Sequence, residues 1–165
     1  VGRISEHKQD IDIGELVEHV IDTLGPCDRT RFRINTPLPC IKGQRRRILQ
    51  IFQNLVSNAV KYTDPAKRVI EIGAKEKPEH WQFYVKDNGN GIDSEYIGKI
   101  FDLFETSEIE DRSESPGVGL TLVKKIIDNF EGDIWVESEP GKGSTFYFTI
   151  TKEEASQNKL CVTNN

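Results

Sequence analysis

Two pairs of strand-like segments constrain the fold of this chain more than any other feature. Each pair is rich in β-branched and aromatic residues and is joined by a short turn, and the pairs are residues 68–76 with 80–87 and residues 132–139 with 143–150. Strands joined by such turns pair antiparallel. We therefore expect a largely antiparallel sheet, with Trp135 and Phe146 of the second hairpin as core residues.

Apolar residues recur at helical spacing in three further segments, which predicts amphipathic helices at residues 13–24, 44–62 and 117–130. A short helix is expected from Ser94 to about Phe101, and a strand at residues 31–35. Residues 37–43 contain two prolines, so no strand is expected there.

The helices need an apolar sheet face to cover. The predicted fold class is therefore an α/β (α+β) two-layer sandwich, with a mixed, mostly antiparallel sheet covered on one face by about three helices. Residues 10–151 would form this one domain, residues 105–116 a polar loop, and residues 152–165 a polar tail. The chain does not begin with Met, which indicates a fragment of a longer protein.

Composition excludes several classes of function. The net charge of −5 argues against nucleic-acid binding through a general positive field, and no apolar run is long enough to span a bilayer. The cysteines Cys27, Cys40 and Cys161 are odd in number and lack metal-ligand spacing. We expect them to be reduced, in a cytoplasmic protein.

The segment VKDNGNGID at residues 85–93 groups acidic and amide side chains around two glycines. A calcium loop needs an oxygen ligand where Gly89 stands and a bidentate Glu where Gly98 stands. A dinucleotide-binding loop needs a third glycine where Ser94 stands. From these residues alone, a turn after a strand remains the simplest interpretation.

The helix at 44–62 carries Asn54, Asn58 and Lys61 three and four residues apart, so the three share one face. Amide oxygens can bind Mg²⁺, and an ammonium group can bind phosphate. The alternative is a solvated polar face.

Two glycine clusters follow in the sequence. Gly117 and Gly119 stand at a predicted helix start, where free N–H groups attract phosphate, and the second cluster is GKGST at residues 141–145. Each alone could be a simple junction or a turn. Their order after the asparagine helix makes the combination more specific than any one piece.

Together these motifs resemble the ATP-binding domain of sensor histidine kinases, in the superfamily shared with gyrase and MutL, whose fold is of the Bergerat type. The resemblance covers about residues 10–151 and rests on five segments: QNLVSNAVKYT, VKDNGNGI, IFDLF, PGVGLTL and GKGSTFYF. The family commonly has an acidic residue where Gln44 stands here, and often a fuller glycine run where Ser115 and Pro116 stand.

The resemblance implies ATP and Mg²⁺ as cofactors. Asp87 would accept a hydrogen bond from the adenine amine, with Thr145 supporting the same edge. Asn58 would hold Mg²⁺, with Asn54 assisting directly or through water, and Lys61 would contact the phosphates or ribose. The remaining nucleotide-binding residues would be Tyr62, Gly89, Gly91, Ile92, Gly117, Val118, Gly119 and Leu120. Residues 105–116 would form the ATP lid.

The same resemblance implies a protein-histidine kinase, with Asn54, Asn58 and Lys61 as its catalytic residues. The ATP-hydrolysing branches have Glu where Asn54 stands, and an amide is no general base, so hydrolysis is disfavoured. His7, His19 and His80 lack the sequence context of an acceptor histidine. The acceptor would lie on a helical domain absent from this chain, so no autophosphorylation of the chain alone is expected.

Residues 1–9 would be the end of that helical dimerisation domain or a linker from it. The further partner would be the receiver domain of a response regulator, with no nucleic acid and no direct membrane contact. A nucleotide-gated interaction module without phosphoryl transfer and a superfamily ATPase are the alternatives. No role is assigned to Arg45, Arg46 and Arg47 beyond a solvated first helical turn.

Overall fold

The computed structural model describes residues 7–25, 29–35, 37–102 and 116–152, and it describes no side chains at 116–118. Its elements in chain order are β1 (Gln9–Asp12), α1 (Ile13–Thr23), β2 (Arg31–Ile34), β3 (Cys40–Gly43), α2 (Arg45–Lys61), β4 (Val69–Glu76), β5 (His80–Asp87), α3 (Ser94–Ile97), α4 (Pro116–Asn129), β6 (Ile134–Glu139) and β7 (Gly143–Thr151).

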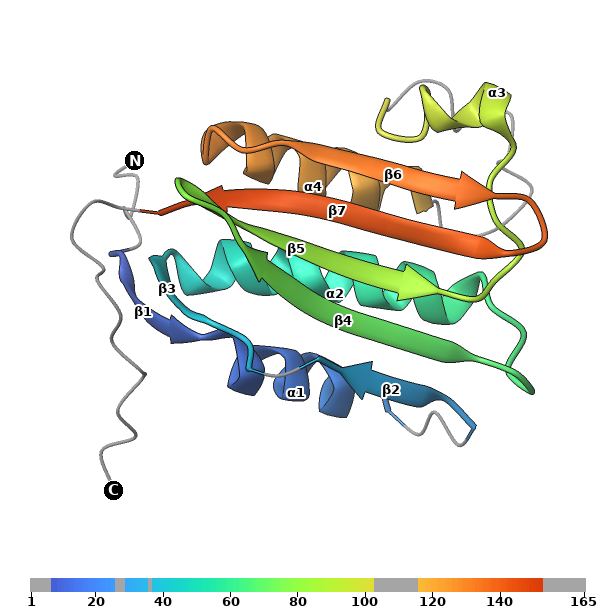
Figure 1. The fold of residues 1–165 in the computed structure, drawn as a ribbon, viewed down its shortest axis with the longest axis horizontal. Coiled ribbons are helices and arrows are strands. Elements are labelled where there is room, and N and C mark those ends of the chain that lie inside the picture. The colour runs from blue at the N-terminus through green and yellow to red at the C-terminus, as the bar shows by residue number, and fades with distance from the viewer. Residues whose placement is uncertain (1–6, 26–28, 36, 103–115, 153–165) are drawn as a thin grey trace.

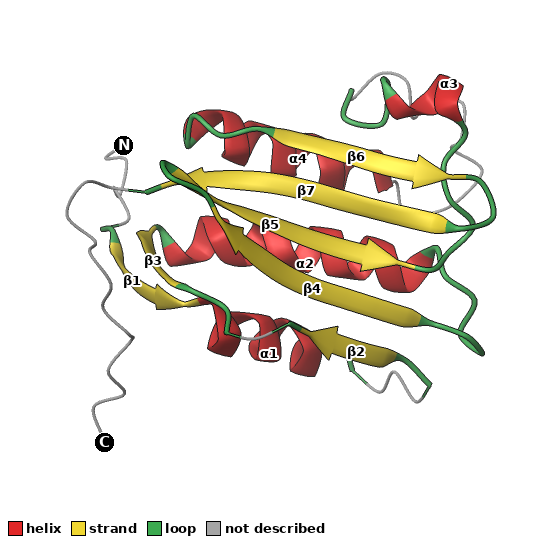
Figure 2. Ribbon diagram, viewed as in Figure 1, coloured by secondary structure: helices red, strands yellow, loops and turns green. Residues whose placement is uncertain are grey.

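The larger sheet has five strands in the order β2-β4-β5-β7-β6. Only β2 pairs in parallel, with β4, and the other three pairings are antiparallel. The helices α1, α2 and α4 cover one face of this sheet (Figures 1 and 2), and the short α3 lies beyond its edge. The predicted fold class and both hairpins are confirmed.

The core consists of rows of apolar side chains that cross the sheet under α2. The register aligns Ile72, Val85, Phe146 and Val136 in one row and Ala74, Phe83, Phe148 and Ile134 in the next. Phe52 of α2 meets the second row, with ring centroids 5.8 Å from Phe83 and 5.3 Å from Phe148, both edge-on. Edge-to-face aromatic pairs add stability beyond the area they bury. This contact fixes α2 on the sheet.

Residues 40–43 form a strand, contrary to expectation. β3 pairs antiparallel with β1, and Gln9 lies opposite Gly43 in a separate two-stranded sheet. The prolines precede the strand, so they remove no N–H group from its ladder. β1 begins at Gln9, one residue before the expected domain boundary.

Cys40, the first residue of β3, is disulfide-bonded. It is the only cysteine among the described residues, so its partner lies outside them. The expectation that all the cysteines are reduced is wrong for this residue.

Trp135 is not a core residue. Its ring stacks on Tyr147, with centroids 5.2 Å apart and an interplanar angle of 14°. Side chains alternate along a strand, and Phe146 and Phe148 point to the helix-covered face. Tyr147 and Trp135, opposite each other in the register, therefore lie on the uncovered face. Phe146 is buried, as predicted.

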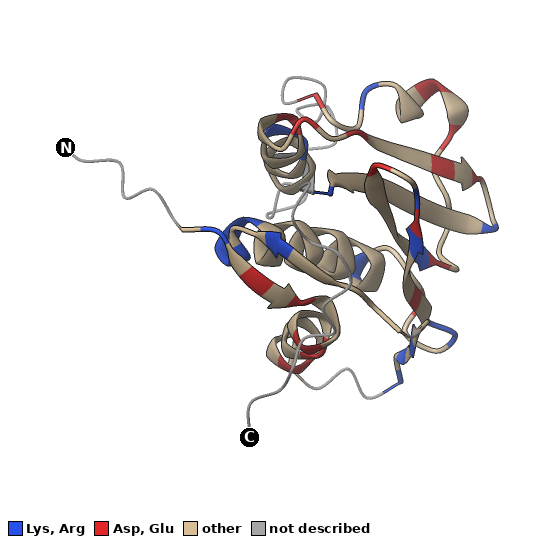
Figure 3. Ribbon diagram, turned by 60° about the vertical axis from the view of Figure 1, so that its left-hand side comes forward, with Lys and Arg blue, Asp and Glu red and all other residues tan. Residues whose placement is uncertain are grey.

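The first turn of α2 carries the arginines Arg45, Arg46 and Arg47, which Figure 3 shows in blue at the start of this helix. The preceding N-cap residue, Gln44, makes no side-chain capping hydrogen bond. Asp12 does cap α1, because its Oδ1 accepts from the Glu15 N–H at 3.1 Å. Packing on the sheet rather than capping therefore accounts for the stability of α2.

Replacing Phe52 with alanine tests that packing. The fully buried ring contacts two strands, so Phe52→Ala should lower the free energy of unfolding by about 3–5 kcal/mol, measured by urea denaturation. Tyr96→Ala, at a ring 46% exposed, is the control and should change it by less than about 0.5 kcal/mol. Equal effects of the two variants would contradict this account of the core.

Candidate functional site

The apolar rows of the sheet end in a polar row. The register places Ser144 of β7 between Asp87 of β5 and Ser138 of β6, on the helix-covered face. Asp87 and Ser144 are each only 7% exposed. Lys, Glu, Arg and Asp are almost never this buried without partners. The end of the sheet beneath α2 is therefore the first place to look for a ligand site.

Burial raises the pKa of the Asp87 carboxyl above its ordinary value. The backbone N–H groups of Gly89 and Ser144 act in the opposite direction, because they donate to the charged carboxylate. The Gly89 N–H lies 2.8 Å from Asp87 Oδ1. A carboxylate has more acceptor positions than these two donors use, so it can accept from a ligand as well.

The loop after Asp87 is a turn, and the side chain of its first amide residue, Asn88, is bonded within the protein. Asn88 Nδ2 donates to Lys67 O and its Oδ1 accepts from Val69 N–H, both at 2.8 Å. Asp93 is the N-cap residue of α3. Within the described residues no group of three or more His, Cys, Asp or Glu could hold a metal ion. The calcium-loop interpretation therefore has no support here.

The loop is packed against the end of α2. A Cβ atom built on Gly89 would lie 2.5 Å from Tyr62 O and 2.9 Å from Thr63 Oγ1, closer than real contacts allow. Thr63 is buried, and its hydroxyl donates to Ala59 O at 2.8 Å. The last turn of α2 therefore forms one wall beside Asp87.

The asparagine face of α2 leads from this wall toward α4. Asn54 Nδ2 donates to Gln50 O at 2.8 Å, which leaves Oδ1 turned away from that bond. A Cβ built on Gly119 would lie 2.9 Å from Asn54 Oδ1, so this oxygen faces the first turns of α4. Asn58 is half-buried one turn further along α2, and Lys61 and Tyr62 are exposed at its end.

The wall beside Asp87 and the asparagine face are the two ends of the candidate site, and both lie along α2. Eight residues separate Asn54 from Tyr62, which at 1.5 Å per residue is about 12 Å along the helix axis. The candidate site therefore extends over about two turns of α2.

The start of α4 is described in part. Gly117 and Val118 are helical, Gly119 faces Asn54, and Leu120 is buried in the core. The segment predicted as a lid lies outside the described residues, apart from Pro116.

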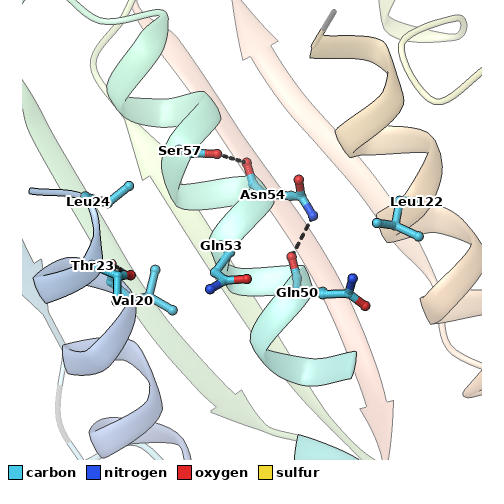
Figure 4. Close-up of a pocket in the computed structure, with 8 residues that line it drawn as sticks. All are labelled: Val20, Thr23, Leu24, Gln50, Gln53, Asn54, Ser57 and Leu122. Carbon is cyan, nitrogen blue, oxygen red and sulfur yellow. Dashed lines mark hydrogen bonds between the residues drawn. The ribbon is translucent and has the colours of Figure 1, made fainter. Parts of the chain in front are cut away.

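A groove of about 490 Å³ runs along the outer face of α2 (Figure 4). Its polar lining is Gln50, Gln53, Asn54 and Ser57, and its apolar lining is Val20, Leu24 and Leu122, with Thr23 at its edge. It shares Asn54 with the candidate site but does not include Asp87. The groove therefore adjoins the Asn54 end of the candidate site and not the Asp87 end.

Thr145 does not lie beside Asp87. It pairs with Lys86, and alternation along β7 directs it to the uncovered face of the sheet. Ser144 occupies the place expected for Thr145, opposite Asp87 and on the same face. The alternation of Phe146, Phe148 and Ile150 in the sequence could have assigned Ser144 to the helix side.

Ile92 lies at the end of the glycine loop. It packs partly buried against the core, and its N–H donates to Ser138 Oγ at 2.8 Å. Ser138 and Thr63 were not predicted as site residues, because their part in the site depends on contacts between distant segments.

Comparison with known proteins identifies the family of this chain. Residues 43–154 match the family described as histidine kinase-, DNA gyrase B-, and HSP90-like ATPase. The chain is similar to cyanobacterial phytochrome B of Nostoc sp. (strain PCC 7120), with 40% identity over 91% of this chain and 21% of that protein. It is also similar to the methanogenesis regulatory histidine kinase FilI of Methanothrix harundinacea, with 34% identity over 91% of this chain and 17% of that protein.

Among solved structures, the catalytic domain of histidine kinase ThkA superposes with a TM-score of 0.74 at 26% identity, over 88% of this chain and 96% of that one. The fold and the family match define a domain of the ATPase type with a two-layer α/β architecture. The chain belongs to the histidine kinase-, DNA gyrase B-, and HSP90-like ATPase family, and within it to the histidine kinase type.

The chain spans about one fifth of the length of these curated relatives. In the described part of the chain, no helix combines the length and apolarity needed to cross a bilayer.

The close packing of the loop at residues 88–93 against β6 can be tested directly. Gly91 and Gly141 both have positive φ, 74° and 82°, but only a Cβ on Gly91 would meet backbone, at 2.3 Å from Glu139 O. Gly141→Ala should therefore lower the free energy of unfolding by about 1–2 kcal/mol and Gly91→Ala by clearly more, in urea denaturation. If Gly91→Ala cost no more than Gly141→Ala, the close approach of this loop to β6 would be wrong.

Proposed function

We propose that this chain is the ATP-binding catalytic domain of a sensor histidine kinase. Within its full-length parent it transfers the γ-phosphoryl group of ATP to a histidine on a helical domain. One observation carries the proposal. The buried Asp87 carboxylate lies beside the C-terminal end of α2, and the same helix carries the asparagine face that leads toward α4.

Asp87 binds the base in this proposal. Its carboxylate accepts a hydrogen bond from the exocyclic amine of adenine, whereas guanine presents an acceptor at the same position. Ser144 supports this edge in place of Thr145, because it lies opposite Asp87 on the same face. Gly89 and Gly91 lack side chains, so the loop packs closely on its neighbours and leaves room for the purine. The Ile92 N–H fixes the end of that loop through its bond to Ser138.

Asn58 and Asn54 bind Mg²⁺, directly or through water, and Lys61 and Tyr62 contact the phosphates or ribose. The donor set fits the ion, because amide oxygens are ligands that Mg²⁺ accepts and Asn54 Oδ1 is turned toward the phosphate end. Mg²⁺ supplies neutralisation of phosphate charge. The N–H groups of Gly117 and Gly119 and the adjoining Val118 and Leu120 form the phosphate side, at the positive end of the α4 dipole.

Transfer is favoured over hydrolysis by the residue at position 54. The Asn54 amide cannot take a proton from water near neutral pH, and its Nδ2 is already bound to Gln50 O. The protein therefore contributes position and charge neutralisation to the phosphoryl transfer.

The acceptor histidine lies outside this chain in the proposal. His80 begins β5 and Asp87 ends it, so seven residues at about 3.3 Å each place them about 23 Å apart. His19 lies on α1, which packs on the side of α2 opposite α4. The phosphoryl group would pass from the acceptor histidine to a response-regulator receiver domain in the cytoplasm. In the proposal, the residues before β1 connect to the acceptor domain, and the predicted lid at residues 105–116 and tail at residues 152–165 lie, apart from Pro116 and Lys152, outside the described residues.

A transfer assay tests the proposal. The chain is mixed with the helical domain of its full-length parent and labelled ATP with Mg²⁺, and acid-labile phosphohistidine is measured. Wild type should label the helical domain. Asp87→Asn should weaken ATP binding about 10- to 100-fold, because a hydrogen bond to a charged acceptor is lost. Asp22→Asn, at an exposed residue of α1, is the control and should retain wild-type affinity.

Three outcomes would contradict parts of this account. Label on His7, His19 or His80 would place the acceptor within the chain. ATP binding without transfer would favour a nucleotide-gated interaction module. Unchanged ATP affinity in Asp87→Asn would remove Asp87 from the base site.

A further inference from the structure

The polar row at the end of the sheet contains a hydroxyl with three neighbours. Ser138 Oγ lies 2.8 Å from the Ile92 N, 3.0 Å from Gly143 O and 2.8 Å from Ser144 Oγ. The three neighbours belong to the glycine loop after β5 and to β7, so this one side chain joins two segments far apart in the sequence.

Counting protons fixes the direction of each bond. A serine hydroxyl has one proton to donate and two lone pairs. The Ile92 N–H can only donate and the Gly143 carbonyl can only accept, so Ser138 gives its proton to Gly143 O. The bond to Ser144 must then be donated by the Ser144 hydroxyl. This is the arrangement that satisfies all three contacts together.

The consequence falls on Ser144. Its only hydroxyl proton is directed to Ser138, so its remaining lone pairs are what it presents beside the Asp87 carboxylate. Both side chains of the row that face the base are then acceptors. An amino group can donate to such a pair, whereas a carbonyl oxygen meets two acceptors and no donor.

We propose that Ser138 is a positioning residue that sets the base specificity of this site, by fixing the Ser144 hydroxyl as an acceptor next to Asp87. The inference rests on the proposed ATP function and adds one residue that determines which base the site prefers. The ligand class it selects is a purine nucleotide with an amino group at position 6, against one with an oxo group there.

Ser138 has a structural role as well. Through Ile92 it holds the glycine loop to β6, and a second bond from Gly141 N–H to Asn90 O, 2.7 Å long, holds the loop to the β6–β7 turn. Loss of Ser138 therefore weakens binding of any purine nucleotide. Base preference, and not affinity alone, separates the two roles.

The test compares ATP with inosine triphosphate, which carries an oxo group at position 6, by calorimetric titration with Mg²⁺. Wild type should prefer ATP. In Ser138→Ala the Ser144 proton is freed and can donate to an oxo group, so the ratio of the two affinities should fall about tenfold. Ser138→Thr keeps the hydroxyl and should retain the wild-type ratio.

Thr149→Val is the matched control. Thr149 lies on β7, is 6% exposed, and its hydroxyl also accepts a backbone N–H, that of Asp133, at 2.9 Å. Thr149→Val removes a hydrogen bond from a backbone N–H to a side-chain hydroxyl, as Ser138→Ala does, but at a position away from the base. The ratio of ATP to inosine triphosphate affinity should therefore stay at the wild-type value.

The outcomes distinguish the inference from the function beneath it. If Ser138→Ala lowers both affinities together and leaves their ratio unchanged, the inference is overturned, while the proposed ATP-binding function of the wild-type chain still stands. If Ser138→Ala does not fold, Ser144→Ala decides: its ratio should also fall, and an unchanged ratio overturns the inference. Wild type that binds neither nucleotide would overturn the proposed function and the inference with it.

Discussion

The burial of one carboxylate at the end of an apolar sheet face is the constraint on which the site depends. Two rows of the core are apolar across four strands, and the next row keeps Ile70 on β4 but has Asp87, Ser144 and Ser138 on the other three strands. Burial penalises the charge on Asp87, and among the described residues the backbone N–H groups of Gly89 and Ser144 offset that penalty. A donor on a ligand meets a group that is already dehydrated and held in place. Preorganisation of this kind favours a specific base over a loosely matched one.

The helix α2 connects this carboxylate to the rest of the chemistry. Its apolar face is anchored on the sheet through Phe52, and its last turn forms the wall beside the glycine loop. Its outer face carries Asn54 toward α4. Because one rigid element supports both ends of the site, their separation is set by helical rise and not by loop conformation. The same packing that stabilises the fold therefore also sets the spacing between the proposed base and phosphate positions.

Local patterns predicted the fold class, both hairpins and the three long helices, because hydrophobic periodicity and turn chemistry are short-range properties. The pairing of β1 with β3 was missed because it joins residues about thirty positions apart, and the prolines before Cys40 masked a short strand. Trp135 was wrongly assigned to the core because residue type was weighed above strand alternation. The same neglect of alternation selected Thr145 where Ser144 lies beside Asp87. The role inferred for Ser138 needs hydrogen bonds between segments that no single-sequence pattern contains.

Amide chemical-shift mapping by NMR tests the central claim most directly, because it locates the bound nucleotide on the folded chain. On titration with Mg-ATP, we predict the largest shifts at Gly89, Gly91 and Ser144, with a second group at the end of α2. Trp135 and Tyr147, on the uncovered face of the sheet, should shift little. Shifts centred on that uncovered face, with Gly89 and Ser144 unchanged, would contradict the account.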